Sequence, residues 1–369
     1  MVEPSAVTKA SADSRARICT PPTVSVTIAP VATDTFHEAG TLPWDWYVSP
    51  EILASEQERI FRQAWTYACP AEWVADPGAY VACNAGDVPL VVVRGRDGEL
   101  RAFVNVCRHR GSVIADGRGQ RETLQCPYHA WTYDLDGSLR KAPRSEREVD
   151  FRADQLSLRP AAVETLGPLV FVNADADAPP LVDALGPVPD LLDLQGLVFR
   201  ERCEYEVGAN WKIAVENYLE CYHCPVAHQG FTRLVETSPD SYVLAAADGV
   251  WSQYGKAKDG SGDCHFHLVW PTLKINVFPG FANLSIGPVW PVGPERTAGF
   301  LDYFFGPEVT DEEASELMDL DNQIGREDTA LVEAVQRGVR SGAIPNGHLL
   351  LDSEALISAF QKRVFAAIS

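Results

Sequence analysis

The stretch Cys126-Pro127-Tyr128-His129-Ala130-Trp131 decides the fold, together with an earlier stretch, Cys107-Arg108-His109-Arg110-Gly111. Each contributes one cysteine and one histidine, and two short loops carrying these residues can hold one metal group between them. An iron–sulfur cluster with two thiolates on one iron and two imidazoles on the other uses this ligand set. A structural zinc site uses the same residue types, but it usually pairs cysteine with cysteine and histidine with histidine. The mixed pairs therefore favour the cluster over zinc.

A second group of metal-binding residues follows in the stretch from Glu220 to His228. If the segment is helical through Glu220, then Glu220 and His223 are three residues apart and share one helix face. Pro225 would then end the helix and allow His228 to turn back. Two histidines and one carboxylate on one side of an iron leave the other side open for oxygen and substrate. The pattern predicts a mononuclear iron site, although an exposed Glu–His pair on a helix would give the same string.

The segments around these motifs predict two folded domains. Residues 1–40 predict a flexible N-terminal extension, and residues 41–66 a helical segment whose helix covers 51–65. Short β-type runs broken by turns continue to about residue 174 and predict a small all-β domain over 67–174. A linker over 174–180 opens an α+β domain over 175–369. The elements expected there are helices over 211–222, 311–338 and 353–368, and strands over 264–270, 273–278 and 282–286.

Composition and charge limit the classes of function. The 369 residues include 51 acidic and 31 basic ones, for a formal charge of −20 at pH 7, which argues against nucleic acid because its phosphates are bound by Lys and Arg. No run approaches the roughly 20 apolar residues that cross a bilayer, and no secretory signal pattern is present. We therefore expect no membrane partner and a cytoplasmic location, with the nine cysteines as free thiols or metal ligands rather than disulfides.

The two cysteine–histidine stretches resemble the loops of the Rieske non-haem iron oxygenases, the aromatic-ring-hydroxylating oxygenase alpha-subunit family. The stretch from Asn210 to His223 resembles the iron-binding helix of the same family, and the resemblance extends over about residues 41–369. Respiratory-chain Rieske proteins carry extra disulfide cysteines in these loops, where this chain has Ser112 and Tyr128. The resemblance implies an α+β fold, in which an all-β Rieske [2Fe-2S] domain precedes a helix-grip (START-like) catalytic domain with an antiparallel sheet.

The resemblance also assigns metal ligands. The [2Fe-2S] ligands would be Cys107, His109, Cys126 and His129. His223 and His228 would bind a mononuclear Fe(II) together with a distant aspartate, which the family places in an acidic pair before a Gln-Arg-Gly element. Glu327-Asp328 and the later Gln336-Arg337-Gly338 fit that description. Asp328 is the expected ligand, because adjacent helical residues point about 100° apart and only one of the pair can face the metal; the reverse assignment stays open.

Glu220 stands where the family places a carboxylate that bridges an iron ligand to a cluster histidine of the adjacent subunit. Its expected role is that of an electron bridge to His129 or His109 within a head-to-tail homotrimer. The family usually has Asp at this position, and the Glu of this chain resembles the subgroup that oxidises quaternary ammonium compounds.

The resemblance therefore implies the oxygenase component of a multicomponent monooxygenase or dioxygenase, with O2 as co-substrate. No dinucleotide-binding fingerprint is present, so NAD(P)H electrons would arrive through a separate flavin and iron–sulfur reductase. The expected reaction is hydroxylation or N-demethylation of a small molecule, a quaternary ammonium compound first and an aromatic ring second. An electron-transfer Rieske protein without oxygenase activity and a ligand-binding helix-grip module are the other hypotheses.

An ammonium substrate would call for an aromatic cage, because ring faces attract a desolvated cation. The candidates are Trp251, Tyr254, Phe266, Trp270, Phe278, Phe281 and Trp290, with Trp270, Phe281 and Trp251 as the substrate-binding choices. Core packing is the competing interpretation of each ring. His265 and His267 are expected to be polar side chains rather than a third metal site, and Cys221 and Cys224 are expected to be packing residues.

Overall fold

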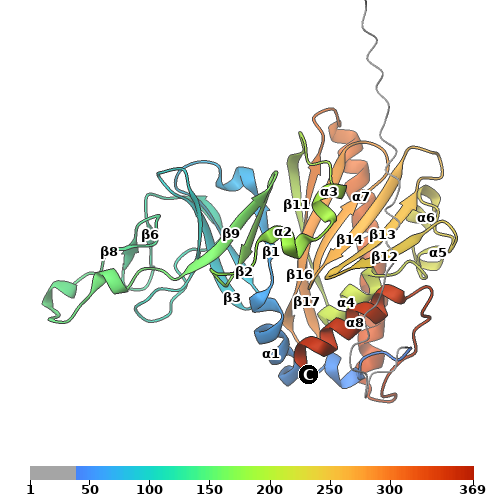
Figure 1. The fold of residues 1–369 in the computed structure, drawn as a ribbon, viewed down its shortest axis with the longest axis horizontal. Helices are drawn as coiled ribbons and strands as arrows, with labels where there is room; N and C mark the ends of the chain where they lie inside the picture. The colour runs from blue at the N-terminus through green and yellow to red at the C-terminus, as the bar shows by residue number, and fades with distance from the viewer. Residues whose placement is uncertain (1–38) are drawn as a thin grey trace, which may run out of the picture.

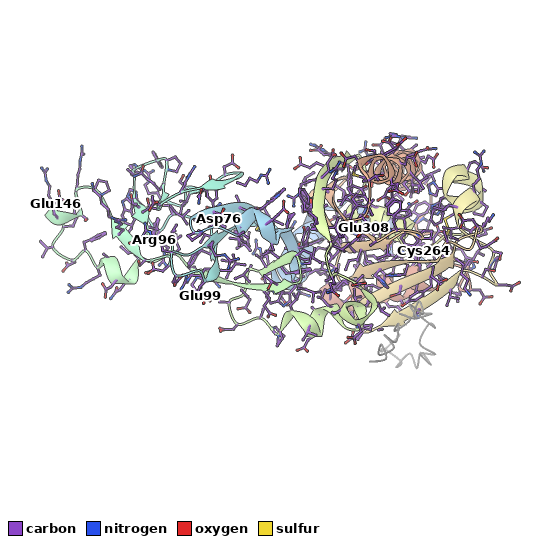
Figure 2. The ribbon with its side chains drawn as sticks, turned by 90° about the horizontal axis from the view of Figure 1, so that it is seen from above. Asp76, Arg96, Glu99, Glu146, Cys264 and Glu308 are labelled. Atoms are coloured by element: carbon purple, nitrogen blue, oxygen red, sulfur yellow. A yellow bond between two sulfur atoms is a disulfide. The ribbon has the colours of Figure 1, made fainter. Side chains whose placement is uncertain are left out.

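A computed structural model describes residues 39–369, so the extension expected over 1–40 lies almost wholly outside the described residues. Two bodies follow one another along the long axis of the molecule (Figure 1), an N-terminal β domain and a larger C-terminal α+β domain. Seen from above, Arg96 and Glu146 of the first body lie toward one end and Cys264 of the second lies toward the other (Figure 2). The molecule is therefore elongated, with one domain at each end of its long axis.

The chain enters the fold through a short helical segment. Helix α1 (Pro50–Arg59) begins at Ser49, whose side chain accepts hydrogen bonds from the backbone N–H groups of Glu51 and Ile52, as expected of an N-cap residue followed by proline. The 3-10 helices η1 (Trp44–Tyr47) and η2 (Phe61–Gln63) flank it. The helix predicted over 51–65 is shorter in the structure, because the chain turns at Ile60 and Phe61, which are only 1% and 5% exposed, to place them in the core.

The N-terminal domain is built on a seven-stranded sheet in the order β1-β10-β9-β4-β3-β2-β5, with a three-stranded sheet β6-β7-β8 beside it. All of its strand pairs are antiparallel. The strands are β1 (Thr66–Pro70), β2 (Ala79–Ala85), β3 (Val88–Arg94), β4 (Leu100–Val104), β5 (Arg118–Gln120), β6 (Leu124–Gln125), β7 (Thr132–Tyr133), β8 (Leu139–Lys141), β9 (Pro160–Leu166) and β10 (Leu169–Asn173). The expected all-β domain is confirmed, and its small sheet carries the motif loop over 126–131.

The C-terminal domain contains a single seven-stranded antiparallel sheet in the order β11-β17-β16-β15-β14-β13-β12. Its strands are β11 (Val198–Val207), β12 (Val243–Ala247), β13 (Val250–Lys256), β14 (Asp263–Val269), β15 (Leu273–Val277), β16 (Asn283–Gly293) and β17 (Arg296–Phe305). The three strands predicted from the sequence are all present. Strand β16 runs well beyond the predicted 282–286, since it pairs with β17 for nearly its whole length.

Helices cover this sheet. They are α2 (Leu181–Leu185), α3 (Val188–Leu191), α4 (Trp211–Tyr218), α5 (Cys224–Ala227), α6 (Gln229–Leu234), α7 (Asp311–Arg340) and α8 (Ala355–Ile368). The long α7 begins with a capping box, in which Thr310 and Glu313 satisfy each other's backbone N–H groups, and it lies beside α4 on one face of the sheet. None of the helices among residues 39–369 is both long and apolar enough to cross a membrane.

The two domains share one core and one buried polar contact. Rings of the first domain, such as Tyr67 and Phe171, pack in the same cluster as Phe300 of β17. The Tyr67 hydroxyl donates to Asp302 Oδ2 at 2.7 Å, and the Arg202 guanidinium donates to both oxygens of that carboxylate at 2.6 and 2.7 Å. Asp302 is fully buried. This three-residue contact, Tyr67–Asp302–Arg202, joins β1 of the N-terminal domain to β17 and β11 of the C-terminal sheet.

Candidate active site

Helix α4 ends at Tyr218, earlier than the predicted 222, so Glu220 and His223 do not share a helix face as expected. The Glu220 carboxylate instead accepts hydrogen bonds from the backbone N–H groups of Tyr222 and His223, the latter at 3.2 Å. A carboxylate that binds nearby backbone N–H groups competes with helix continuation. Pro225, predicted to end a helix, lies in the first turn of the next one, α5. The loop between the two helices therefore orients both Glu220 and His223.

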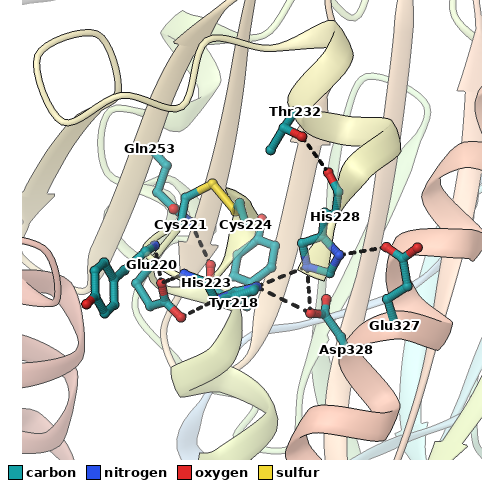
Figure 3. Close-up of a disulfide and its surroundings, with 11 residues drawn as sticks. Tyr218, Glu220, Cys221, His223, Cys224, His228, Thr232, Gln253, Glu327 and Asp328 are labelled. Carbon is teal, nitrogen blue, oxygen red and sulfur yellow. Dashed lines mark hydrogen bonds and ion pairs between the residues drawn. A yellow bond between two sulfur atoms is a disulfide. The ribbon is translucent and has the colours of Figure 1, made fainter. Parts of the chain in front are cut away.

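The structure brings His223, His228 and Asp328 together, although they come from separate elements (Figure 3). The two Nε2 atoms are 3.0 Å apart, and Asp328 Oδ1 lies 3.4 Å from His223 Nε2 and 2.9 Å from His228 Nε2. Their ligand atoms all lie within 4.8 Å of one another. Three donors converging on one point, two imidazoles and one carboxylate, are the set expected for a non-haem iron.

Two acidic residues hold the outer nitrogens of these histidines. Glu327 Oε2 lies 2.8 Å from His228 Nδ1, and Glu220 Oε1 contacts His223 Nδ1. Carboxylates in this position fix the ring orientation and leave Nε2 as the free ligand atom. The neighbours Glu327 and Asp328 thus point at different nitrogens of His228, one outward and one toward the centre.

The electrostatics of the site favour a bound cation. Asp328 Oδ1 is buried and faces the two Nε2 atoms without a well-aligned hydrogen bond within residues 39–369, so this carboxylate oxygen is available to a metal. Burial lowers the pKa of His223, but the carboxylates of Asp328 and Glu220 outweigh it and raise that pKa to about 9. The carboxylates that stabilise a protonated imidazole also stabilise a metal cation bound in its place. The residues present therefore fit a mononuclear iron.

The cluster loops, residues 107–111 and 126–131, bring the second ligand set together. Cys107 and Cys126 are buried thiols of one hydrophobic cluster, and the rings of His109 and His129 lie 4.6 Å apart between centroids. The Tyr133 hydroxyl lies 3.4 Å from Cys107 Sγ. Buried sulfur donors and outer imidazoles suit a cluster whose two irons take different ligands.

Cys221 and Cys224 form a disulfide that encloses His223 in the chain between them (Figure 3). The expectation that the cysteines are free thiols or metal ligands is wrong for this pair, as is their assignment as packing residues. Because α4 has already ended, the loop brings their Cα atoms to 4.9 Å, a separation that a disulfide can bridge.

A cavity of about 570 Å³ opens beside the three metal-ligand candidates, between the sheet, α4 and α7. The aromatic residues among its lining are Tyr205, Tyr218, Phe231, Tyr242, Phe266, Phe278 and Tyr303. Two of the cage candidates, Phe266 and Phe278, thus belong to the lining. Lys274, Tyr205 and Asp321 also line the cavity and were missed; the alternation of β15 was the one sequence signal that could have pointed to Lys274.

The three substrate-binding choices lie outside the cavity lining. Trp251 and Trp270 pack on Phe360 of α8, with ring centroids 5.6 and 6.0 Å away. Phe281 packs on Phe305, 6.1 Å away. Helix α8 covers the Trp251 end of the sheet face, a long-range contact that strand alternation alone does not reveal.

His265 and His267 belong to a separate buried network. His267 receives contacts of 2.7 Å from Ser252 Oγ and from His265 Nδ1, and burial lowers the pKa of His265 to about 4 and of His267 to about 3. Neither belongs to the group formed by His223, His228 and Asp328, whose ligand atoms lie within 4.8 Å of one another. The two strand histidines are neutral side chains that hydrogen-bond within the sheet.

Comparisons with known proteins match both domains. The chain matches the family described as Rieske [2Fe-2S] domain over residues 64–163, and the one described as ring hydroxylating alpha subunit (catalytic domain) over 194–263 and 245–369. A carnitine monooxygenase oxygenase subunit of Acinetobacter pittii is 34% identical over 86% of this chain and 90% of its own length. The chloroplastic choline monooxygenase of Spinacia oleracea is 30% identical over 88% of this chain and 77% of its length.

Solved structures give the same result. The quaternary ammonium Rieske monooxygenase CntA in complex with L-carnitine superimposes with a TM-score of 0.80 at 33% identity, over 89% of this chain and 96% of that one. The naphthalene 1,2-dioxygenase of a Rhodococcus species reaches a TM-score of 0.74 at 20% identity, over 89% of this chain and 94% of that one; at that identity the likeness concerns the fold alone. The expected α+β architecture, with a catalytic domain after a cluster-binding β domain, is confirmed.

Proposed function

The chain belongs to the Rieske non-haem iron oxygenases, and from this premise we propose that it oxidises a quaternary ammonium compound. The oxygenase components of this family pair a [2Fe-2S] domain with a ring-hydroxylating alpha-subunit catalytic domain. The observation that carries the proposal is the identity of about one third, over most of both chains, with carnitine monooxygenase oxygenase subunits. The expected classes of activity and cofactor, an oxygenase component with a [2Fe-2S] cluster and a mononuclear iron, follow from the family itself. The substrate, the site residues and the assembly are proposals.

In this proposal Cys107, His109, Cys126 and His129 hold the cluster, and His223, His228 and Asp328 hold Fe(II). When bound, the cluster and the iron supply one-electron transfer and the activation of O2. Glu220 and Glu327 keep the two imidazoles oriented by binding their Nδ1 atoms. The position of the metal is thereby fixed at one end of the cavity before substrate arrives.

The cavity supplies the binding energy for an ammonium group. Its wall contains several aromatic rings near the metal residues, among them Phe231, Phe266 and Tyr242. Ring faces attract a desolvated cation by about 2 kcal/mol or more. The same rings would accept an uncharged aromatic substrate, and for that reason the two classes are compared directly in the test.

Electrons are proposed to pass between subunits. The cluster loops belong to the N-terminal domain, whereas α5 and α6 lie on the far side of the C-terminal domain (Figure 1). A solved relative is described as revealing inter-subunit electron transfer. We therefore place Glu220 as the bridge to His129 or His109 of the partner subunit in a head-to-tail homotrimer, with a flavin and iron–sulfur reductase as the source of NAD(P)H electrons.

Other expectations stay predictions. The domain limits of 67–174 and 175–369 are close to the matched family regions, which begin at 64 and 194, and we retain them as our division. We propose a cytoplasmic location, and we propose monooxygenation rather than dioxygenation because relatives at 30–34% identity are named monooxygenases.

The test is reductase-driven oxygen uptake by the iron-loaded protein. Carnitine, γ-butyrobetaine, glycine betaine and choline would be compared with a panel of aromatic acids and amines, and products would be followed by mass spectrometry with a formaldehyde assay in parallel. We expect uptake coupled to product only with ammonium compounds. Coupled uptake with aromatic compounds alone would replace the proposal by ring hydroxylation, and no coupled uptake would favour an electron-transfer protein or a binding module.

A further inference from the structure

Lys274 places a positive charge in the wall of the cavity. It lies on β15, where Leu273 and Ile275 point into the core on the other face of the sheet, and Lys274 and Asn276 point into the cavity. Its ammonium lies 4.9 Å from the ring centroid of Tyr205 and 5.7 Å from that of Tyr218. A cavity proposed to attract a cation thus carries a cation of its own.

Among residues 39–369, no carboxylate lies within ion-pair distance of this half-buried ammonium. The fully buried Lys212, by contrast, meets Glu56 at 2.5 Å. Asp321 lines the same cavity, but its Oδ2 contacts Ser285 Oγ at 3.2 Å and Tyr303 OH at 3.0 Å. Charges taken out of water are normally paired, because an unpaired one is costly.

The charge on Lys274 is retained at neutral pH. Burial by itself would lower the pKa of Lys274, but the neighbouring Tyr205 and the carboxylates of Asp321 and Asp328 raise it above its usual value. The side chain therefore offers N–H donors and a full positive charge to whatever occupies the cavity.

A second donor stands beside it. The Tyr205 hydroxyl is buried and makes no well-aligned hydrogen bond within residues 39–369. Its polar neighbour is the Lys274 ammonium, which can only donate a hydrogen bond, so the Tyr205 O–H is left without an acceptor. Its ring crosses β17 at Gly299, where an added Cβ would come within 2.6 Å of the Tyr205 hydroxyl, so the glycine leaves room for the phenol. Buried hydroxyl groups normally find partners. An unsatisfied hydroxyl next to an unpaired ammonium points to a ligand with an anionic oxygen.

We propose that Lys274 and Tyr205 form a carboxylate-binding subsite, and that the substrate is a zwitterion with a quaternary ammonium group at one end and a carboxylate at the other. The inference rests on the proposed function, since it concerns the same cavity. The carboxylate lies against Lys274 and Tyr205, and the ammonium end extends toward the aromatic rings and the metal residues. Carnitine and γ-butyrobetaine have this form, whereas choline lacks the carboxylate.

The experiment compares each acid with its own ester. Binding of γ-butyrobetaine and of its methyl ester is measured by calorimetry on the iron-loaded protein, and KM for both is measured by coupled oxygen uptake. We expect the wild type to prefer the acid by roughly tenfold to a hundredfold, the range of a charge-assisted hydrogen bond. Lys274→Met should abolish this preference by weakening acid binding, with the ester changed by less than about twofold. Tyr205→Phe should reduce the preference in the same direction and by a smaller factor.

Lys256→Met is the matched control, because Lys256 ends β13 in an exposed position away from the cavity lining. Arg326→Met tests the one other cationic residue in the lining, which is exposed on α7. Equal affinity of the wild type for acid and ester overturns the subsite whether or not any variant folds. A preference lost in Arg326→Met but kept in Lys274→Met also overturns it. Coupled turnover of choline and the ester but not of the acid refutes the subsite and leaves the proposed function standing, whereas no ammonium turnover at all refutes the proposed function.

Discussion

Glu327 and Asp328 are adjacent acids with different expected effects on metal binding. Asp328→Asn removes the anionic ligand whose Oδ1 faces both Nε2 atoms, and we expect it to abolish mononuclear iron binding. Glu327→Gln removes only the carboxylate behind His228, and we expect iron affinity to fall by about tenfold to a hundredfold. Titration of the apoprotein with Fe(II), followed by metal analysis, measures both. Loss of iron in Glu327→Gln with retention in Asp328→Asn would reverse the assignment of the pair.

Substitution of Glu220 should slow electron delivery without removing the iron. Because it binds Nδ1 of His223 rather than the metal centre, Glu220→Gln should leave most of the iron and the reducible cluster in place. We expect oxidation of the reduced cluster in the presence of substrate and O2 to slow by about tenfold to a hundredfold, as followed by stopped-flow absorbance. Glu220→Asp, with the residue usual in the family, should be slowed less. Wild-type rates in Glu220→Gln would remove the residue from the electron path.

Glu216 makes stability depend on pH. It lies on α4 and is partly buried, where Tyr47 of η1 and Gln361 of α8 donate to its Oε1 at 2.7 and 2.8 Å. Burial raises its pKa from 4.5 to about 7 in spite of these hydrogen bonds. The folded protein therefore holds this proton more tightly than the unfolded chain, and stability is lost as pH rises from about 5 to about 8, by up to about 3 kcal/mol.

Melting temperatures of the wild type and of Glu216→Gln over that pH range measure this contribution. The glutamine variant is always neutral and should lose less stability than the wild type as pH rises. A steeper decline in the variant than in the wild type would contradict the raised pKa.

Residue chemistry explains which side chains the sequence could identify. Cysteine and histidine at fixed spacing carry strong chemical information, so the loops over 107–111 and 126–131 and the candidate ligands His223 and His228 could be selected without a structure. Lys274 and Tyr205 have no such signal, because a lysine in a strand is normally solvated and only the fold encloses it. The Cys221–Cys224 disulfide was missed since it depends on the early end of α4, which the apolar pattern did not predict.

At the scale of elements, α7 carries Asp328 on a long helix whose start is fixed by the Thr310–Glu313 capping box. Thr310→Ala should cost about 1 kcal/mol and lower the melting temperature by about 2 °C. Iron content should not change, because about five helical turns separate the cap from Asp328. Thr310→Ser keeps the hydroxyl and should melt like the wild type. Loss of iron on Thr310→Ala would mean that the cap also positions the metal residues.

Element boundaries were predicted less well than element types, for a local reason in each case. Helix α4 stops where Glu220 binds the backbone of its own loop, and α1 stops where Phe61 turns into the core. Each helix end is set by a side-chain contact of its own, which the spacing of apolar residues does not reveal. Helix α7 was predicted almost to its ends, because a long amphipathic repeat is a local signal.

At the scale of the whole molecule, two inactive variants should restore each other. Asp328→Asn keeps the cluster residues and Cys126→Ser keeps the iron residues. If electrons cross between subunits, hetero-oligomers from coexpression of the two variants should recover roughly a quarter of wild-type activity per chain. Half of the chains keep the iron residues, and half of their partners keep the cluster residues. Separately expressed variants, mixed only after assembly, serve as the control, and hetero-oligomers with no activity would assign electron transfer to a single chain.

The Tyr67–Asp302–Arg202 contact has a mechanical consequence. It ties β1 to β17 and β11 through a fully buried carboxylate, inside a hydrophobic cluster that both domains share. A β domain held in this way cannot swing on a hinge to carry its cluster toward the iron. Electron transfer to the iron then requires no large movement of the N-terminal domain through solvent. Solvent viscosity therefore does not limit its rate. We therefore expect kcat to be unchanged when glycerol raises the viscosity, until diffusion of the substrate or the reductase becomes rate-limiting.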